Sequence, residues 1–182
     1  MHVFLTGEIQ VGKSTVINKT LNLLNINYGG FKTYFGENRH SSDKILYMNS
    51  AAEPKAFDEE NVIAKFQEGR MPVADVLKFN TYGSELIRDA KKKADLILMD
   101  ECGSLEFKAL EFQREVIDAL NGYKPVFGVV KLSSKGWTDA IRNHSNVKLI
   151  TVTKENRDYL PDVLKDFFRY KAEKVHNEAQ KK

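Results

Sequence analysis

The chain has 182 residues, and its 28 lysines and arginines against 25 aspartates and glutamates leave a formal net charge of only +3. This length suits about one domain, and a composition of 42% hydrophobic and 29% charged residues excludes a disordered or fibrous protein. The last twelve residues hold four lysines and two glutamates, so the remainder is close to neutral and a nucleic-acid partner is not expected. We predict one domain over residues 1–170 and a basic helix end or tail over residues 171–182.

Signals that would direct the chain to a membrane or out of the cell are missing from the sequence. Uninterrupted apolar runs such as residues 96–99 are far shorter than the roughly 20 residues that a membrane-spanning helix needs. The N-terminus lacks the charged and long apolar regions of a secretory signal, and the single cysteine, Cys102, cannot form an internal disulfide. We therefore expect a cytoplasmic protein without a membrane partner, and we favour a monomer.

The pattern of apolar residues predicts alternating strands and helices. A buried strand over residues 2–6 is followed by a loop over residues 7–15 and a helix to about Leu24. Gly29 and Gly30 are expected to interrupt the next element. Short edge strands or hairpins are expected at residues 31–35, 44–48, 61–66 and 74–79. The second half is expected to hold helices from Tyr82 to Lys93, from Leu105 to Leu120, at residues 137–143 and from Leu160, with strands at residues 94–100, 125–131 and 147–152.

This alternation predicts an α/β fold with a mostly parallel sheet and helices on both of its faces. The short segments between residues 31 and 79 are expected to add a small antiparallel extension. Ligands bind such sheets at the carboxyl ends of the strands, and two of the predicted ends carry residues suited to chemistry.

The loop after the first strand fits the phosphate-binding pattern GxxxxGK[ST], and it lies between a predicted strand and a predicted helix. Gly7 and Gly12 permit backbone conformations that turn N–H groups toward phosphate oxygens, and the helix N-terminus attracts the same anion. Lys13 is expected to reach the β- and γ-phosphates and act in catalysis, Ser14 to bind Mg²⁺, and Thr15 to bond the α-phosphate. The predicted nucleotide-binding residues of this loop are Gly7, Glu8, Ile9, Gln10, Val11, Gly12, Lys13, Ser14 and Thr15.

A second candidate site lies at the end of the strand over residues 94–100, where Asp100 is followed by Glu101. Asp100 would hold the Mg²⁺ shell. Glu101 suits the catalytic base that orients or deprotonates the attacking water, because hydrolysis needs a base that the metal does not occupy. Glu106 is either a supporting acid or a carboxylate that favours a helix N-terminus. Cys102 is interpreted as a small packing residue rather than a redox thiol.

Four segments in this order make the chain resemble the cancer-related nucleoside-triphosphatase family, whose members have also been called predicted nucleotide kinases. The segments are residues 7–15, 29–35, 95–107 and 151–160. The resemblance extends from residue 1 to about residue 170. It departs where Gln10 replaces glycine, Cys102 replaces isoleucine and Leu105 replaces methionine, and residues 36–80 match poorly.

The resemblance implies a magnesium-dependent enzyme that hydrolyses ATP, GTP and other nucleoside triphosphates slowly, with little base selectivity. It implies a single P-loop core with a RecA-like sheet and no helical lid. It also implies that Asp100 binds the metal, that Glu101 holds the water, and that Asn156 and Arg157 lie near the base. From the residues alone, Asn156 and Arg157 fit a helix cap as readily as a base contact, although Arg157 could stack on a nucleobase.

Two other functions remain open from the sequence. A P-loop kinase would pass the phosphoryl group to a nucleoside, a nucleotide or another small hydroxyl compound. Arg114 is the only arginine between the acidic strand end and residue 123, which argues against the usual arginine-bearing lid, although Arg39 and Arg70 are available to an acceptor pocket. A nucleotide-operated binding module would instead change its affinity for a partner between triphosphate and diphosphate states. The candidates for a transition-state arginine are Arg114, Arg142 and Arg157.

Overall fold

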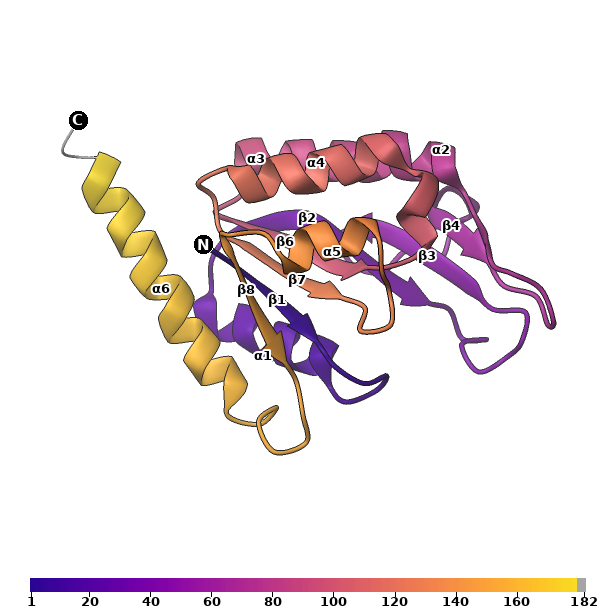
Figure 1. Ribbon diagram of the computed structural model, residues 1–182, viewed down its shortest axis with the longest axis horizontal. Coiled ribbons are helices and arrows are strands. Elements are labelled where there is room, and N and C mark those ends of the chain that lie inside the picture. The colour runs from indigo at the N-terminus through magenta and orange to yellow at the C-terminus, as the bar shows by residue number, and fades with distance from the viewer. Residues whose placement is uncertain (180–182) are drawn as a thin grey trace.

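The computed structural model describes residues 1–179 and contains an eight-stranded sheet with helices on both faces (Figure 1). The strand order is β5-β4-β3-β2-β6-β7-β1-β8. Strands β2, β6, β7, β1 and β8 pair in parallel, and β3, β4 and β5 extend one edge in antiparallel pairing. The strands are β1 (His2–Thr6), β2 (Tyr28–Phe35), β3 (Ile45–Ser50), β4 (Val62–Lys65), β5 (Val73–Ala74), β6 (Leu96–Cys102), β7 (Val126–Val130) and β8 (Val147–Thr151). The predicted mostly parallel sheet with an antiparallel extension is confirmed.

The helices form two layers, with α1 and α6 on one face of the sheet and α3, α4 and α5 on the other (Figure 1). The α-helices are α1 (Lys13–Leu24), α2 (Val76–Lys78), α3 (Ser84–Lys93), α4 (Leu110–Asn121), α5 (Trp137–Arg142) and α6 (Leu160–Ala179). Two short 3-10 helices, η1 (Glu59–Asn61) and η3 (Leu105–Lys108), and a π-helical segment, η2 (Phe79–Gly83), complete the elements.

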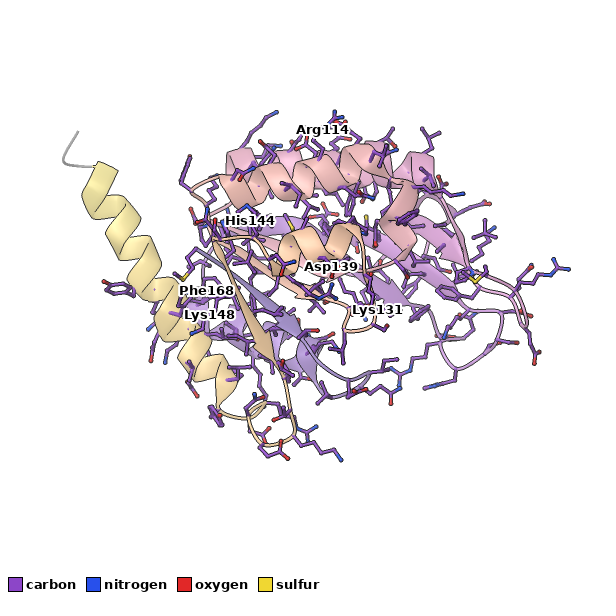
Figure 2. All side chains as sticks on the ribbon, in the orientation of Figure 1. Arg114, Lys131, Asp139, His144, Lys148 and Phe168 are labelled. Carbon is purple, nitrogen blue, oxygen red and sulfur yellow. The ribbon has the colours of Figure 1, made fainter. Side chains whose placement is uncertain are left out.

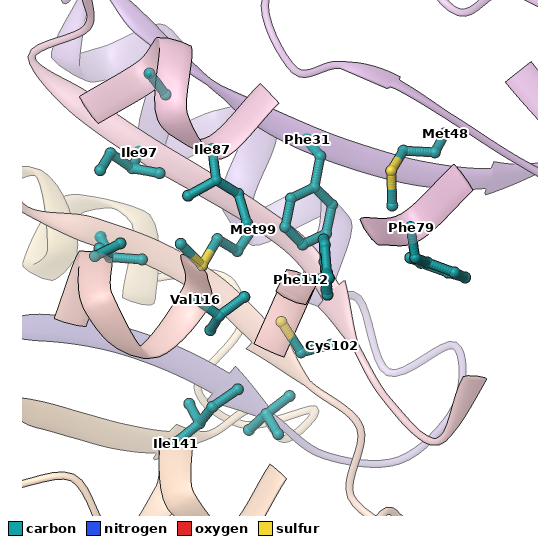
Figure 3. Packing of buried hydrophobic residues seen from close by; sticks show 14 of the residues in the cluster. Phe31, Met48, Phe79, Ile87, Ile97, Met99, Cys102, Phe112, Val116 and Ile141 are labelled. Atoms are coloured by element: carbon teal, nitrogen blue, oxygen red, sulfur yellow. The ribbon is translucent and has the colours of Figure 1, made fainter. Parts of the chain in front are cut away.

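Two hydrophobic cores result from the alternation of side chains along the buried strands. In β1, Val3 and Leu5 belong to the core beneath α1 and α6, whereas Phe4 belongs to the core beneath α3 and α4. The second core is rich in aromatic residues, and the rings of Phe31 and Phe112 lie 5.1 Å apart within it (Figure 3). Because the sheet is covered on both faces at β1 and β7, these two strands are almost entirely buried and mostly apolar.

The expectation that Gly29 and Gly30 interrupt an element is wrong, because both lie inside β2. Gly30 has a φ of +97°, and a Cβ added there would lie 2.1 Å from the carbonyl oxygen of Leu98 on β6. A Cβ added at Gly29 would lie 3.1 Å from the Cβ of Ala90 on α3. The pair therefore lets β2 approach both β6 and α3 closely, which is a role of glycine within a strand.

The edge strand predicted at residues 74–79 is also wrong, because β5 ends at Ala74 and helical structure begins at Val76. The Asp75 side chain accepts a hydrogen bond of 2.9 Å from the backbone N–H of Lys78 and so caps the new helix. The chain then continues through η2 into α3 without a break. The sequence signal for this helix was the aspartate at its N-cap. A short apolar run by itself does not distinguish a strand from a helix.

Other expected boundaries differ by a few residues. The strand predicted at residues 94–100 is β6 and reaches Cys102, and the helix predicted from Leu105 begins as η3 and becomes α-helical only at Leu110. The last helix, α6, runs to Ala179. Lys181 and Lys182 of the predicted tail lie outside the described residues, and the boundary at residue 170 stays a prediction. Among residues 1–179, no helix has the length and apolar composition that a membrane crossing requires.

Candidate active site at the carboxyl ends of the strands

The predicted phosphate-binding loop connects β1 to α1, and its two terminal glycines have positive φ angles. Gly7 has a φ of +138°, and a Cβ added there would lie 2.6 Å from the carbonyl oxygen of Val152. Gly12 has a φ of +116° and is the N-cap residue of α1. Both positions therefore favour glycine, as the motif predicts.

Gln10 lies at the exposed tip of this loop and has a φ of +63°. This is the position where the resembling family usually has glycine, and the left-handed backbone gives the physical reason for that preference. Glu8 and Ile9 are likewise exposed.

Lys13 is half-buried at the first position of α1, and its ammonium group lies over its own loop. Lys13 Nζ donates to the carbonyl oxygens of Gly7, at 2.9 Å, and Glu8, at 2.8 Å. Ser14 and Thr15 are exposed in the first turn of α1, where the helix N-terminus attracts anions. This segment thus carries one ammonium group, two hydroxyl groups and a helix N-terminus.

Asp100 and Glu101 lie near the carboxyl end of β6, next to β2. The backbone N–H of Glu101 donates to Thr33 Oγ1 on β2 at 3.3 Å. Burial, together with the neighbouring charge of Glu101, raises the pKa of Asp100 to about 7, although the charges of Lys13 and Lys55 act in the opposite direction. Burial also raises the pKa of Glu101, against the effect of Lys131 and Lys13. The two neighbouring carboxyl groups are thus partly buried, and each has a raised pKa.

A cavity of about 170 Å³ brings the loop and the acids together. Ser14, Asp100 and Glu101 line it together with three aromatic residues, Tyr34 and Phe35 from β2 and Phe66 just after β4. This volume has room for several water molecules, each of which occupies roughly 30 Å³ in the liquid. The lining residues are Ser14, Thr33, Tyr34, Phe35, Leu46, Phe66, Asp100, Glu101, Gly103, Ser104, Leu105, Glu106 and Lys131.

The turn that follows the two acids is held by hydrogen bonds that the sequence did not predict. Glu106 is almost completely buried, and its Oε2 accepts from the backbone N–H of Gly103 at 2.9 Å. Trp137 Nε1 donates to the carbonyl oxygen of Gly103 at 2.7 Å. Burial raises the pKa of Glu106 to about 7. Glu106 thus supports the turn beneath the site, and it also lies in the first turn of η3, so its position fits both interpretations offered by the sequence.

Cys102 is fully buried in the core beneath α4 (Figure 3). Burial raises the pKa of its thiol well above the usual value. A thiol in this state is a poor nucleophile, in agreement with its interpretation as a packing residue.

Asn156 and Arg157 lie in the connection from β8 to α6, beside the phosphate-binding loop. The side-chain amide of Asn156 forms its hydrogen bonds within this connection. Its Oδ1 accepts from the Thr153 N–H at 2.9 Å, and its Nδ2 donates to the Thr151 carbonyl oxygen at 2.8 Å. Arg157 is exposed, and its Nη1 donates to the carbonyl oxygen of Val11 at 3.2 Å. Arg157 is therefore available to a ligand bound on the loop, whereas Asn156 mainly shapes the connection.

The other two arginines proposed for the transition state are engaged elsewhere. Arg114 is exposed on the outer surface of α4 and forms an ion pair of 2.8 Å with Glu111 (Figure 2). Arg142 forms an ion pair of 2.9 Å with Asp139. Within residues 1–179, no helical lid follows the acids, because η3 and α4 pack against the sheet.

The donors around the cavity fit a magnesium ion. Ser14 offers a hydroxyl and Asp100 a carboxylate, which are the hard oxygen ligands that Mg²⁺ prefers. Among the described residues, no group of three or more histidine, cysteine, aspartate or glutamate side chains forms a metal site. Mg²⁺ is usually held by one or two protein ligands together with substrate phosphates and water, so a hydroxyl and a carboxylate beside a phosphate-binding loop suit it.

Comparisons with known proteins agree with this site. The model of a family described as NTPase matches residues 2–164. Nucleoside-triphosphatase THEP1 of Methanocaldococcus jannaschii is 29% identical over 169 residues, which cover 88% of this chain and 92% of that protein. The cancer-related nucleoside-triphosphatase of Homo sapiens is 26% identical over 185 residues, which cover 90% of this chain and 94% of that protein.

A solved structure has the same fold. The crystal structure of THEP1 from the hyperthermophile Aquifex aeolicus aligns with a TM-score of 0.73 at 20% sequence identity, over 92% of this chain and 99% of that chain. The family expected from the four sequence segments is confirmed by the family model and by the named relatives. The chain belongs to the NTPase family.

Proposed function

We propose that this protein hydrolyses nucleoside triphosphates, ATP and GTP among them, to the diphosphate and phosphate in a Mg²⁺-dependent reaction with weak base selectivity. The observation that carries the proposal is that Ser14, Asp100 and Glu101 line one cavity at the end of the phosphate-binding loop. The family and the names of the relatives support the same reaction. The kinase alternative receives no support from these names.

The phosphate-binding loop would hold the triphosphate through its backbone N–H groups and the N-terminus of α1. Lys13 would exchange its two carbonyl contacts in the loop for the β- and γ-phosphates, and Thr15 would bond the α-phosphate. Ser14 and Asp100 would hold Mg²⁺, which when bound neutralises phosphate charge and orients the phosphates. The exposed guanidinium of Arg157 would stack on the nucleobase, and a stacking contact discriminates weakly between bases.

Glu101 would orient a water molecule in line with the γ-phosphate and take up its proton. The water oxygen forms a bond to the γ-phosphorus, and the bond from that phosphorus to the bridging β–γ oxygen breaks. Its electron pair leaves with the diphosphate. The overall reaction is balanced in atoms and charge, because triphosphate and water give diphosphate, phosphate and a proton. Lys13 stabilises the charge that develops on the transferred group.

Release of inorganic phosphate from ATP or GTP, without a second substrate, tests this proposal. We expect the Lys13→Ala variant to release phosphate about 100-fold or more slowly than the wild type, because one preorganised cation is lost from the transition state. Removal of Mg²⁺ with a chelator should likewise stop release. The control is Lys19→Ala, an exposed lysine further along α1, which should keep the wild-type rate. If the wild type releases no more phosphate than Lys13→Ala, the proposed function is wrong.

A further inference from the structure

Lys131 lies just beyond the carboxyl end of β7. The order of the strands makes this position relevant to the candidate site. β7 lies between β1, which leads into the phosphate-binding loop, and β6, which carries the two acids. A side chain at the end of β7 therefore lies between the two halves of the site. Figure 2 shows Lys131 in the loop that follows this strand.

The backbone of Lys131 is fixed on both sides. Its N–H donates to the Cys102 carbonyl oxygen at 2.9 Å, which ties it to the strand of the acids. Its carbonyl oxygen accepts from Arg142 Nη2 at 2.5 Å and from the Ser134 N–H at 3.1 Å. Arg142 is itself held by Asp139. The base of the Lys131 side chain is therefore preorganised.

The side chain of Lys131 extends across Gly103 into the cavity. A Cβ added at Gly103 would lie 3.5 Å from Lys131 Cδ and 3.7 Å from its Cβ, so the lysine stem packs directly on this glycine. Lys131 then lines the cavity together with Ser14, Asp100 and Glu101. Its charge also lowers the pKa of both Glu101 and Glu106, which means that its ammonium group lies near these carboxyl groups.

The ammonium group of Lys131 is not committed to a partner in the described part of the chain. No ion pair joins it to a carboxylate there, in contrast to Lys91, which pairs with Glu115 at 2.6 Å. Hydrolysis of a triphosphate is accelerated by a further cation beside the equatorial oxygens of the γ-phosphate, where charge develops. Arg114 and Arg142 form ion pairs elsewhere, so neither supplies that cation from its present position.

We propose that Lys131 is a catalytic residue whose ammonium group contacts the γ-phosphate oxygens and stabilises the charge of the transition state, in the place of an arginine. This inference rests on the proposed function. It goes beyond the proposed function by assigning a second cation, in addition to Lys13, that the same chain supplies. Because a diphosphate lacks the γ-phosphate, the contact would be absent in the product complex.

The test compares Lys131→Met with Lys131→Arg and Lys135→Met. Lys135 is an exposed lysine of the same loop and serves as the matched control. We expect Lys131→Met to lower kcat for phosphate release about 100-fold, with a much smaller change in KM. Lys131→Arg should recover part of the rate, and Lys135→Met should keep the wild-type rate. The melting temperature of each variant shows whether it is folded.

Affinity for two ligands separates a catalytic role from a structural one. Lys131→Met should bind Mg²⁺ and ADP as the wild type does, and should bind the complex of Mg²⁺, ADP and aluminium fluoride, which mimics the transferred phosphoryl group, far more weakly. Wild-type kcat in Lys131→Met, or equal losses for ADP and for the fluoride complex, would contradict the assignment. If the wild type itself releases no phosphate above Lys13→Ala, the proposed function fails first and the role of Lys131 with it.

Discussion

The local sequence predicts the positions of some residues of the site but not of others. The phosphate-binding loop is a local structure whose glycines are required by the backbone itself, as the contact between a Cβ at Gly7 and the Val152 carbonyl oxygen illustrates. Asp100 and Glu101 were likewise predictable, because an apolar run ending in acids identifies them. Glu106 and Lys131 were not assigned to the cavity, because their importance depends on neighbours distant in sequence. Their roles require the folded turn at Gly103 and the strand order.

Gln10 provides a test at the scale of a single residue. Its φ of +63° is costly for a residue with a side chain, so Gln10→Gly should stabilise the protein by up to about 1 kcal/mol, after the larger chain entropy of glycine is subtracted. Thermal unfolding without nucleotide should show a melting temperature higher by roughly 2–4 °C. Gln10→Ala, which keeps the strained backbone, is the control and should show no gain. A glycine variant that melts no higher than the alanine variant would contradict this account.

Elements were predictable where they are long and periodic, and less so where they are short. The helices and strands from β6 onward follow the predicted order. Residues 74–79 were misassigned because a brief apolar run fits a strand and a helix equally, and the cap formed by Asp75 decides the outcome. The position of β7 between β6 and β1 follows from the pairing of distant strands. This pairing, which brings Lys131 into the site, has no local signal in the sequence.

His2 connects β1 to the end of α4 and the start of β7, and it predicts a pH dependence of stability. Its buried ring bonds the Leu120 carbonyl oxygen through Nε2 at 2.9 Å and accepts from the Val126 N–H through Nδ1 at 3.1 Å. Burial lowers the pKa of His2 from 6.5 to about 4. The unfolded chain therefore binds a proton that the folded chain excludes, and the free energy of unfolding falls as the pH decreases from about 6.5 to about 4, by roughly 3 kcal/mol in total.

Denaturant unfolding of the wild type and of His2→Gln across this pH range checks the prediction. Asp100 and Glu106 act in the opposite direction, since burial raises the pKa of each to about 7, but they are present in both proteins. The difference in unfolding free energy between the two proteins should therefore shrink as the pH falls. His40→Gln removes an exposed imidazole and is the control. A difference that stays constant from pH 7 to pH 4 would contradict the role given to His2.

At the scale of the whole molecule, the site needs local charge and little net charge. The formal charge of +3 is small, yet the charges of Lys13 and Lys131 both act on the carboxyl group of Glu101 at the carboxyl ends of the central strands. Tyr34 and Phe35 at the end of β2 and Phe66 just after β4 also line the cavity. The mostly parallel sheet was predictable from the alternation of elements, whereas the place of Phe66 at the cavity was not, because it depends on the pairing of β2 with β3 and of β3 with β4. The fold thus joins two predictable motifs through contacts that only the structure reveals.

Phosphate release by the Glu101→Gln variant is the decisive measurement for hydrolysis by a water molecule held at Glu101. The amide keeps the shape of the side chain and removes the base, so the variant should bind ATP and Mg²⁺ within about threefold of the wild type and release phosphate roughly 100- to 1000-fold more slowly in a single turnover. Glu111→Gln, a change on the outer surface of α4 beside Arg114, should leave both quantities unchanged. The account predicts loss of rate with retained binding for Glu101→Gln, and a wild-type rate in that variant would contradict it.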